Sequence, residues 1–238
     1  AAALTVFNPN GWAQTGLVPF EWEDALVDPV VSDGENLYSV QKTADGAWLF
    51  RANAVPAKGW QQYAVLPRTD VKTKELIYRE SGTLAASLHH LENDYLKVTL
   101  DQNGQFSSIY DKKAGRELLK AGKNGNVLMT YEDRPHNYDA WDVNNYYVEK
   151  SWEVTDVQHL SLIEDGPLRA TIQVVRRYLD SEITQYISLE ADSPELKIRN
   201  EIDWREQKIF LKTLFPVDIH TDEATYEIQY GNVTRKTH

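Results

Sequence analysis

The chain has 238 residues, of which 42% are hydrophobic and 11% aromatic, and it carries a formal net charge of −11. These values predict a folded protein with a sizeable core, arranged as one large all-β domain or two smaller ones, and exclude a disordered chain. The acidic charge argues against nucleic acid and membrane partners, and no apolar run reaches the ~18 residues that a membrane span needs.

The chain contains no cysteine, which excludes disulfides and thiol chemistry and favours a cytoplasmic location. The first residues, "AAALTVFNPNGW", lack the basic and long apolar regions of a signal peptide. The chain has no initiator Met and ends abruptly at "YGNVTRKTH". We therefore expect a piece of a longer protein, with a trimmed mature chain as the alternative.

In chain order, short strands are expected first, over residues 4–66. They predict a small β-sandwich domain that covers residues 1–66. Turn signals such as Ser32-Asp33-Gly34 and Ala44-Asp45-Gly46 separate these strands. The polar stretch 67–88 contains Pro, Ser and Gly and is expected to be a linker. A longer series of strands follows over residues 89–238.

Alternation of apolar and polar residues is the dominant pattern in this second part. Residues 95–111, "YLKVTLDQNGQFSSIYD", predict a hairpin, and 111–119 predict a turn with at most one short helical stretch. Ile183, Ile187 and Leu189 share one face of the next strand, and residues 196–204 place Leu196, Ile198, Ile202 and Trp204 on one face. The expected class is all-β, built of antiparallel β-sandwiches.

The sequence lacks the common motifs of metal sites, of nucleophilic serine hydrolases and of phosphate-binding loops. No HExxH, G-x-S-x-G or Gly-rich phosphate motif is present. Asp218 and His220 share one side of a strand, but no further metal ligand is evident nearby, and a solvent-facing strand edge is the more common reading. No metal site is therefore expected in this chain.

The window "RPHNYDAWDVNNYY", residues 134–147, interleaves aromatic rings with Asp and Asn. Tyr and Trp offer flat apolar surface to the C–H faces of sugars, and Asp and Asn bind hydroxyl pairs. Asp139 and Asp142 are also geometrically possible as an acid–base pair for glycoside hydrolysis. Two alternatives remain open: the Asp residues cap a loop, and Trp141 and Tyr146 are core aromatics.

Ordered sequence blocks resemble the β-rich part of family 38 α-mannosidases. They are "LENDYLKVTLDQNGQFSSIYDKKAGREL", "GNVLMTYEDRPHNYDAWDV" and "FPVDIHTDEATYEIQYGNVTRKTH", starting at residues 91, 125 and 215. "VFNPNGW" and "VPAKGWQQYAV" also resemble that family's first sandwich, although residues 14–17 depart slightly from its usual pattern. Together the matches span nearly the whole chain.

The resemblance implies that residues 89–238 form part of a galactose-mutarotase-like supersandwich, truncated after His238. It also implies that full-length members are retaining α-mannosidases, acting on terminal α-D-mannosides, whose N-terminal domain carries the Asp nucleophile and one Zn²⁺. A three-helix bundle is implied between that domain and the β part. This chain has no counterpart of the nucleophile or the zinc ligands, so we expect no catalytic residue, no bound cofactor and no activity from it alone.

The resemblance further implies that loops of this chain face the enzyme's own catalytic domain and the mannoside substrate. The substrate-binding candidates are Tyr138, Asp139, Trp141, Asp142, Arg235 and His238, with interdomain packing as the alternative role. A second hypothesis is an autonomous carbohydrate-binding or mutarotase-like domain, for which His89, His90 and Glu92 are the nearest reactive residues. A third is a purely structural or adhesive sandwich.

Overall fold

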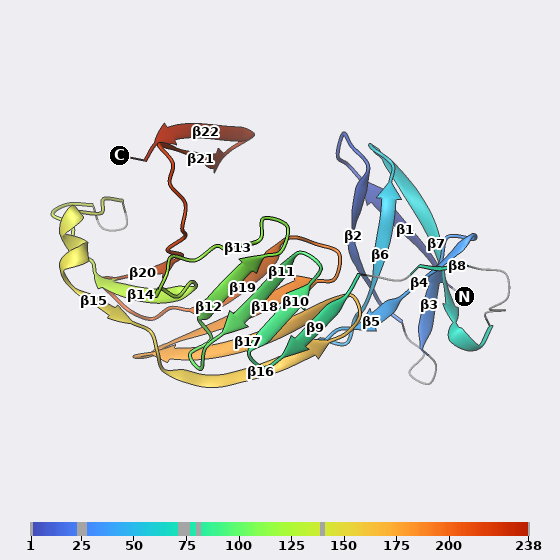
Figure 1. The fold of residues 1–238 in the computed structure, drawn as a ribbon, viewed down its shortest axis with the longest axis horizontal. Coiled ribbons are helices and arrows are strands. Elements are labelled where there is room, and N and C mark those ends of the chain that lie inside the picture. Colours follow the sequence, from blue (N-terminus) through green and yellow to red (C-terminus); the bar gives the residue numbers. More distant parts are fainter. Residues whose placement is uncertain (1, 23–27, 71–76, 80–81, 139–140, 238) are drawn as a thin grey trace.

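The computed structural model describes residues 2–22, 28–70, 77–79, 82–138 and 141–237 of the chain. Within these ranges, strands arranged mostly in antiparallel sheets make up nearly all of the regular structure. Figure 1 shows a smaller N-terminal unit beside a larger unit formed by the rest of the chain. The predicted all-β class is confirmed, while the likeness to galactose mutarotase stays a prediction.

The N-terminal unit packs a five-stranded sheet against a three-stranded one. Its strands, in sheet order, are β1 (Ala2–Asn8), β7 (Gly59–Pro67), β3 (Pro29–Ser32), β4 (Asn36–Tyr38) and β8 (Ile77–Arg79), then β2 (Gln14–Phe20), β6 (Trp48–Val55) and β5 (Val40–Lys42). Only β4 and β8 pair in parallel among the described strands. The fully buried Phe50 ring makes edge contacts with Phe20, Tyr38 and Tyr63, and these rings form the centre of the core.

The larger unit packs two sheets face to face. One contains β13 (Arg116–Glu117), β12 (Phe106–Asp111), β11 (Leu96–Leu100), β10 (His90–Asn93) and β9 (Leu84–Ser87), and the other contains β16 (Val157–Asp165), β17 (Arg169–Tyr178), β18 (Ser181–Glu190) and β19 (Leu196–Asp203). Inward-facing side chains of both sheets form a single apolar cluster, which includes Leu91, Val98, Ile172 and Ile187. Alternation along the strands is what places these residues on the shared face.

Two further sheets extend this sandwich. β15 (Ser151–Glu153), β14 (Val127–Glu132) and β20 (Ile209–Leu214) form one, and the C-terminal hairpin β21 (Glu223–Ile228) and β22 (Gly231–Lys236) forms the other. Among the residues that the structure describes, two segments form 3₁₀ helices, η1 (Arg68–Asp70) and η2 (Asn145–Glu149). The hairpin projects away from the sandwich in Figure 1.

The predicted hairpin over residues 95–111 is confirmed as β11 and β12. The predicted turn within 111–119 is confirmed, and the segment continues as β13 without the short helical stretch that the sequence allowed. Gly115 adopts φ +66°, which ends any helical turn. Glu117 Oε1 accepts from the amides of Leu118 and Leu119, and the Leu118 amide also donates to the Ile109 carbonyl.

The expectation for residues 196–204 is partly corrected. Leu196 and Ile198 pack against the sandwich core, and Trp204 stacks on Tyr178. Ile202, however, is 48% exposed. β19 is an edge strand of its sheet, and Ile202 belongs to neither neighbouring apolar cluster.

Residues 67–88, the expected linker, contain β8 and β9 among their described residues. β8 pairs with β4 in the N-terminal unit, whereas β9 pairs with β10 in the larger unit. The stretch therefore contributes one strand to each unit. The division of the chain at 1–66 and 89–238 stays a prediction.

The side-chain amide of Gln41 joins the two units. Gln41 Oε1 accepts from the backbone N–H groups of Leu168 and Arg169, both at 2.9 Å, and its Nε2 donates to the Arg169 carbonyl at 2.7 Å. Gln41 is buried, and a Cβ added to Gly166 would approach its amide carbon to 2.3 Å. The turn between β16 and β17 therefore needs glycine to admit this amide.

A guanidinium, that of Arg176, is fully buried in the larger unit. Its Nη1 donates to Gln185 Oε1 and its Nη2 to the Asn103 carbonyl, both at 2.6 Å. Gln185 in turn exchanges hydrogen bonds with the buried Asn126. Desolvation lowers the pKa of Arg176 to about 10, opposed by the charge of Asp101. The network links β17, β18, the β11–β12 turn and the start of β14.

We expect Arg176→Ala to lower the free energy of unfolding by about 3 kcal/mol, because it removes two charge-assisted hydrogen bonds and leaves a cavity. The exposed neighbour Arg177 supplies the matched control, and Arg177→Ala should change stability by less than about 0.5 kcal/mol. Urea unfolding of the three proteins measures both values. Equal stability of the two variants would contradict a structural role for the buried guanidinium.

Gln41→Leu should lower the unfolding free energy by about 2 kcal/mol, because it leaves the buried N–H of Leu168 and the half-buried N–H of Arg169 without an acceptor. Gln62→Leu, at an exposed position of β7, is the control. Limited proteolysis should cut the variant between the two units faster than the parent. Unchanged proteolysis together with unchanged stability would argue that the units are held together elsewhere.

Candidate functional site

The segment between β14 and β15 leaves its sheet and returns to it, forming a loop over residues 133–150. Its base is closed by hydrogen bonds from Asp133 N to the Lys208 carbonyl and from Glu132 N to the Lys150 carbonyl. Glu132 also forms ion pairs with Lys150 at 2.9 Å and Arg134 at 3.0 Å. Hydrogen bonding from Lys150 lowers the pKa of Glu132, so its carboxylate stays ionised at neutral pH.

Lys212 on β20 anchors the returning half of the loop. Its Nζ donates to the Tyr147 hydroxyl at 2.6 Å and lies 4.7 Å from the centre of the Tyr147 ring. The rings of Tyr131 and Phe210 flank the same ammonium group at 5.9 and 5.6 Å. Tyr147 lies on η2, so this cation–π cluster fixes η2 against β14 and β20.

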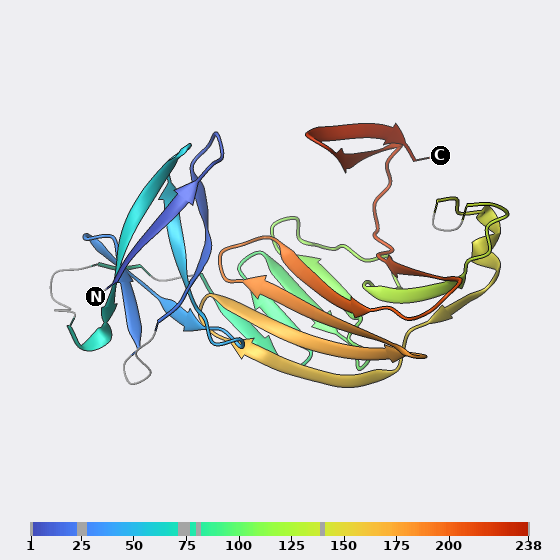
Figure 2. The same cartoon turned by 180° about the vertical axis from the view of Figure 1, so that it is seen from behind.

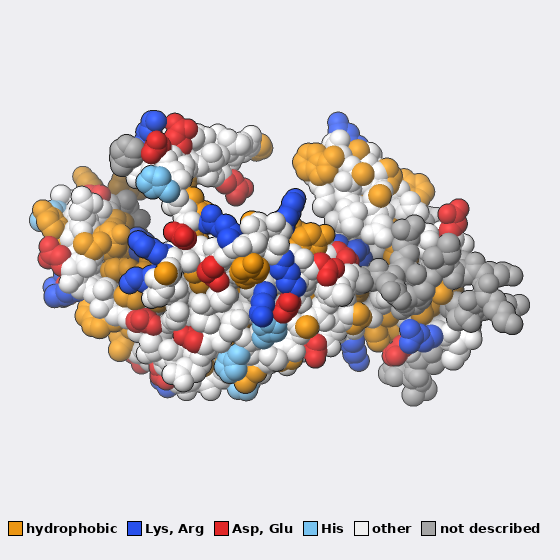
Figure 3. Space-filling view, viewed as in Figure 1, with side chains coloured by type: hydrophobic (Ala, Val, Ile, Leu, Met, Phe, Trp, Pro, Cys, Tyr) orange, Lys and Arg blue, Asp and Glu red, His pale blue; other side chains and the backbone are white. Residues whose placement is uncertain are grey.

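The tip of the loop is exposed and aromatic. Tyr138, Trp141 and Tyr146 are 76%, 88% and 67% exposed. The amides of Trp141 and Asp142 both donate to the Tyr138 carbonyl, and Tyr138 adopts φ +60°. A non-glycine residue in this left-handed conformation is uncommon and clusters at functional turns. Figure 3 shows hydrophobic side chains gathered at this end of the molecule.

The exposure of the loop shows whether its aromatic residues belong to the core or to the surface. Trp141 and Tyr146 are not core aromatics, because both are largely exposed. The aromatic residue that packs inward is Tyr147. An exposed Trp beside two exposed Tyr side chains offers apolar surface to a partner, and the base of the loop is fixed by ion pairs and the Lys212 cluster.

The structure brings only some of the predicted site residues together. Tyr138, Trp141 and Asp142 share the loop tip, whereas Arg235 lies on the exposed β22. Asp139 and His238 fall outside the described residues, so the proposed Asp139–Asp142 pair has no described geometry. The substrate-binding role of all six residues stays a prediction.

Sequence reasoning missed Lys212, Tyr131 and Phe210. The available signal was a lysine at alternating spacing from an aromatic in "IFLKTL", residues 209–214. Their meeting with Tyr147 depends on the pairing of β14 with β20, which joins residues about 80 positions apart.

The histidine and glutamate named for a mutarotase-like site lie on one strand instead of across a groove. His90 Nε2 is 2.9 Å from Glu92 Oε2, and Lys112 Nζ is 2.7 Å from Glu92 Oε1. The hydrogen bond from Lys112 lowers the pKa of Glu92, with a smaller contribution from His90. His89 is exposed in the turn before β10. This arrangement is an ion cluster at the sheet surface.

Across the described ranges, no group of three or more His, Asp or Glu side chains is placed to hold one ion. Asp218 and His220 are both exposed, and the backbone at Asp218 bonds to Leu118 and to the Arg116 guanidinium. The described residues therefore do not fit a zinc site.

A search for membrane spans gives a separate result: the described residues include no helix with the length and apolar character needed to cross a bilayer.

Comparison with known proteins finds one family and several relatives. The model of the glycosyl hydrolases family 38 C-terminal domain matches residues 91–238. Alpha-mannosidase 2C1 of Homo sapiens and that of Mus musculus are each 33% identical over 150 residues, and alpha-mannosidase G of Dictyostelium discoideum is 30% identical over 157 residues. Each match covers 62% of this chain but only 14% of the relative.

Lys212→Met keeps the length of the side chain and removes the charge, so it should release the loop. We expect hydrogen exchange of the amides in 141–149 to become about tenfold faster, since a cation–π contact and a hydrogen bond contribute about 1–2 kcal/mol together. Lys113→Met, at an exposed position of the turn between β12 and β13, is the control. Exchange that stays at the parent rate would show that the loop is held by its base alone.

Proposed function

Since this chain belongs to glycosyl hydrolase family 38 through that family's C-terminal domain, we propose that it is the β-sandwich portion of a retaining, zinc-dependent α-mannosidase that hydrolyses terminal α-D-mannosides. In this proposal the chain packs on the enzyme's own catalytic domain and closes one wall of the substrate pocket. The single observation that carries the proposal is the loop 133–150, an exposed aromatic tip on a fixed base, within the matched region.

The loop suits this role for physical reasons. The exposed rings of Tyr138 and Trp141 can pack against the apolar C–H face of a mannosyl ring. Asp142 lies one position after Trp141 and presents a carboxylate that accepts from sugar hydroxyls. The fixed base reduces the ordering entropy that binding would otherwise cost.

We assign the reactive groups to another part of the enzyme. Retaining hydrolysis needs a carboxylate nucleophile and a carboxylic acid about 5–5.5 Å apart. Because the described residues do not fit a zinc site, we also assign the Zn²⁺ of the family to a domain other than this one. A cytoplasmic location remains part of the proposal and rests on composition alone.

The alternative of an autonomous carbohydrate-binding domain draws on the same exposed rings. An autonomous mutarotase is disfavoured by the His90–Glu92 pair, whose members bond each other instead of facing a groove. Calorimetry of the isolated chain separates the autonomous carbohydrate-binding domain from the β-sandwich portion of a mannosidase. Micromolar binding of short mannosides at the loop would favour the autonomous module.

In the mannosidase that contains this chain, Trp141→Ala should lower kcat/KM for an aryl α-mannoside by about ten- to a hundredfold, because it removes a flat wall that positions the sugar. The melting temperature should not change, since Trp141 is 88% exposed. Trp60→Ala is the matched control, because Trp60 is also exposed but lies in the N-terminal unit. An unchanged kcat/KM would make the loop a packing element and overturn its proposed role.

A further inference from the structure

A cavity of about 650 Å³ lies at the corner where the two units meet. It is far along the chain from the loop 133–150, and none of its lining residues belongs to that loop. Figure 2 shows from behind the face of β16–β19 that does not carry the β9–β13 sheet, with β2, β5 and β6 beside one end of it. The volume falls within the range of small-ligand sites, about 300–1,000 Å³.

One wall of the cavity is polar and belongs to two adjacent rows of side chains on the sheet. Gln173 lies opposite Tyr186, and Tyr186 lies opposite Arg199, whose guanidinium stacks on the Tyr186 ring at 4.0 Å. Thr171 and Ser188 form the next row and share a hydrogen bond at 2.9 Å. These groups place amide, hydroxyl and guanidinium functions on one flat surface.

Gln173 is the member of this wall with an unused hydrogen-bonding group. It is half-buried, and its amide has no partner among the residues that the structure describes. An amide offers two donors and an acceptor, which suits the vicinal hydroxyls of a sugar. A ligand in the cavity could therefore form hydrogen bonds with the Gln173 amide on this wall.

The apolar part of the lining comes from the N-terminal unit. Leu17 and Pro19 on β2 and Leu49 on β6 line the cavity together with Ala47, while Thr43 and Asp45 of the same unit add polar groups that bond each other. A pyranoside carries C–H groups on its ring faces and hydroxyls around its rim. A lining that is apolar in one part and polar in another matches that distribution, whereas a purely apolar ligand would leave the polar wall unpaired.

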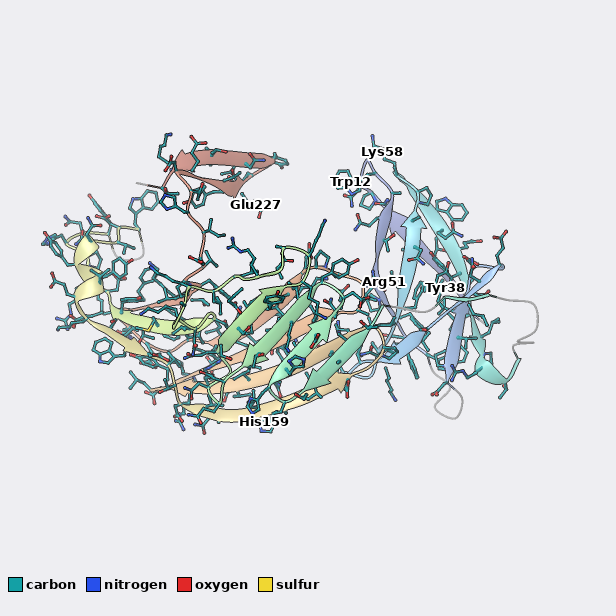
Figure 4. All side chains as sticks on the ribbon, in the orientation of Figure 1. Trp12, Tyr38, Arg51, Lys58, His159 and Glu227 are labelled. Carbon is teal, nitrogen blue, oxygen red and sulfur yellow. The ribbon has the colours of Figure 1, made fainter. Side chains whose placement is uncertain are left out.

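The walls are fixed relative to one another. Gln41 holds the β16–β17 turn, and Ala44 N donates to Glu164 at 3.1 Å beside the cavity. Arg51 of β6 forms an ion pair with Asp192 at 3.0 Å and approaches Glu190 to 3.6 Å. Figure 4 shows Arg51 on the side of the N-terminal unit that faces the larger one. The cavity is therefore preformed, which lowers the ordering cost of binding.

Each cation that lines the cavity pairs with a carboxylate, and Asp45 adds a further carboxylate bonded to Thr43, so the lining disfavours an anionic ligand. Arg169 is bonded to Glu164, Lys197 to Glu190, and Arg199 to Glu201. No lining cation is left without a carboxylate partner in the described part of the chain. An anionic ligand would have to break one of these pairs, whereas a neutral hydroxylated ligand would not.

From these observations we infer that the cavity between the two units is a second saccharide-binding site, which takes a neutral pyranoside between Gln173 and the Leu17–Pro19 wall. The site stands on its own geometry, and only the choice of a mannoside as probe rests on the proposed function. The site contains no reactive pair and binds the sugar without transforming it. Such a site would hold one branch of a glycan while another part of the same enzyme acts elsewhere.

The test is titration of the chain with methyl α-D-mannopyranoside, followed by calorimetry and by amide hydrogen exchange. We expect millimolar binding and slower exchange in residues 43–47 and 186–190, with no change in 141–149. Gln173→Ala should weaken binding about tenfold, since it removes the free amide. Gln207→Ala, an exposed glutamine in the turn before β20, should bind as the parent does.

Two further measurements test this site. Trp60→Ala, at an exposed position of β7 outside the cavity lining, should bind the sugar with parent affinity, and D-glucuronate should bind at least tenfold more weakly than the neutral sugar. The inference is overturned by no binding at tens of millimolar, by equal binding of Gln173→Ala, or by protection in 141–149 alone. Hydrogen exchange reports on the loop and on the cavity separately. The role proposed for the loop can therefore be contradicted while the cavity site is supported, and the cavity site can be contradicted while the role of the loop is supported.

Discussion

The buried guanidinium of Arg176 is the constraint on which the larger unit depends. A cation in an apolar sandwich is tolerated only if its donors are bonded, and here they bond Gln185 and the Asn103 carbonyl. The same requirement explains Gly104, where an added Cβ would lie 2.9 Å from Arg176 Nη2. Through Gln185 and Asn126 the network reaches the start of β14, the strand that leads into the loop.

The loop 133–150 and the cavity differ in how they are built. The loop 133–150 is fixed at its base by Glu132 and Lys212 and leaves its aromatic tip exposed. The cavity is lined by residues of two units that Gln41 holds together. An exposed tip suits a surface completed by another domain, whereas a preformed cavity suits a small ligand that binds alone.

The comparisons establish the family of this chain, whereas its division of labour with a separate catalytic domain is our proposal. Membership in glycosyl hydrolase family 38 rests on the match over residues 91–238. The same chain spans 14% of the length of its α-mannosidase relatives, and its described residues form no metal-binding cluster. Positioning by side chains remote from the reacting atoms is a recognised source of rate enhancement, so the proposed wall of the pocket would affect the rate through positioning alone.

The sequence by itself determined the all-β class, the β11–β12 hairpin and the inward faces of β11 and β18, because alternation and turn residues are local signals. It also identified the loop as unusual, through its aromatic and acidic composition. Only the tertiary structure decided that Trp141 is exposed and Tyr147 packed, that Ile202 is left at an edge, and that Gln41 reaches the turn at Gly166. Each of these depends on contacts between residues distant in the chain, such as Gln41 with Arg169, whose pairing no local pattern encodes.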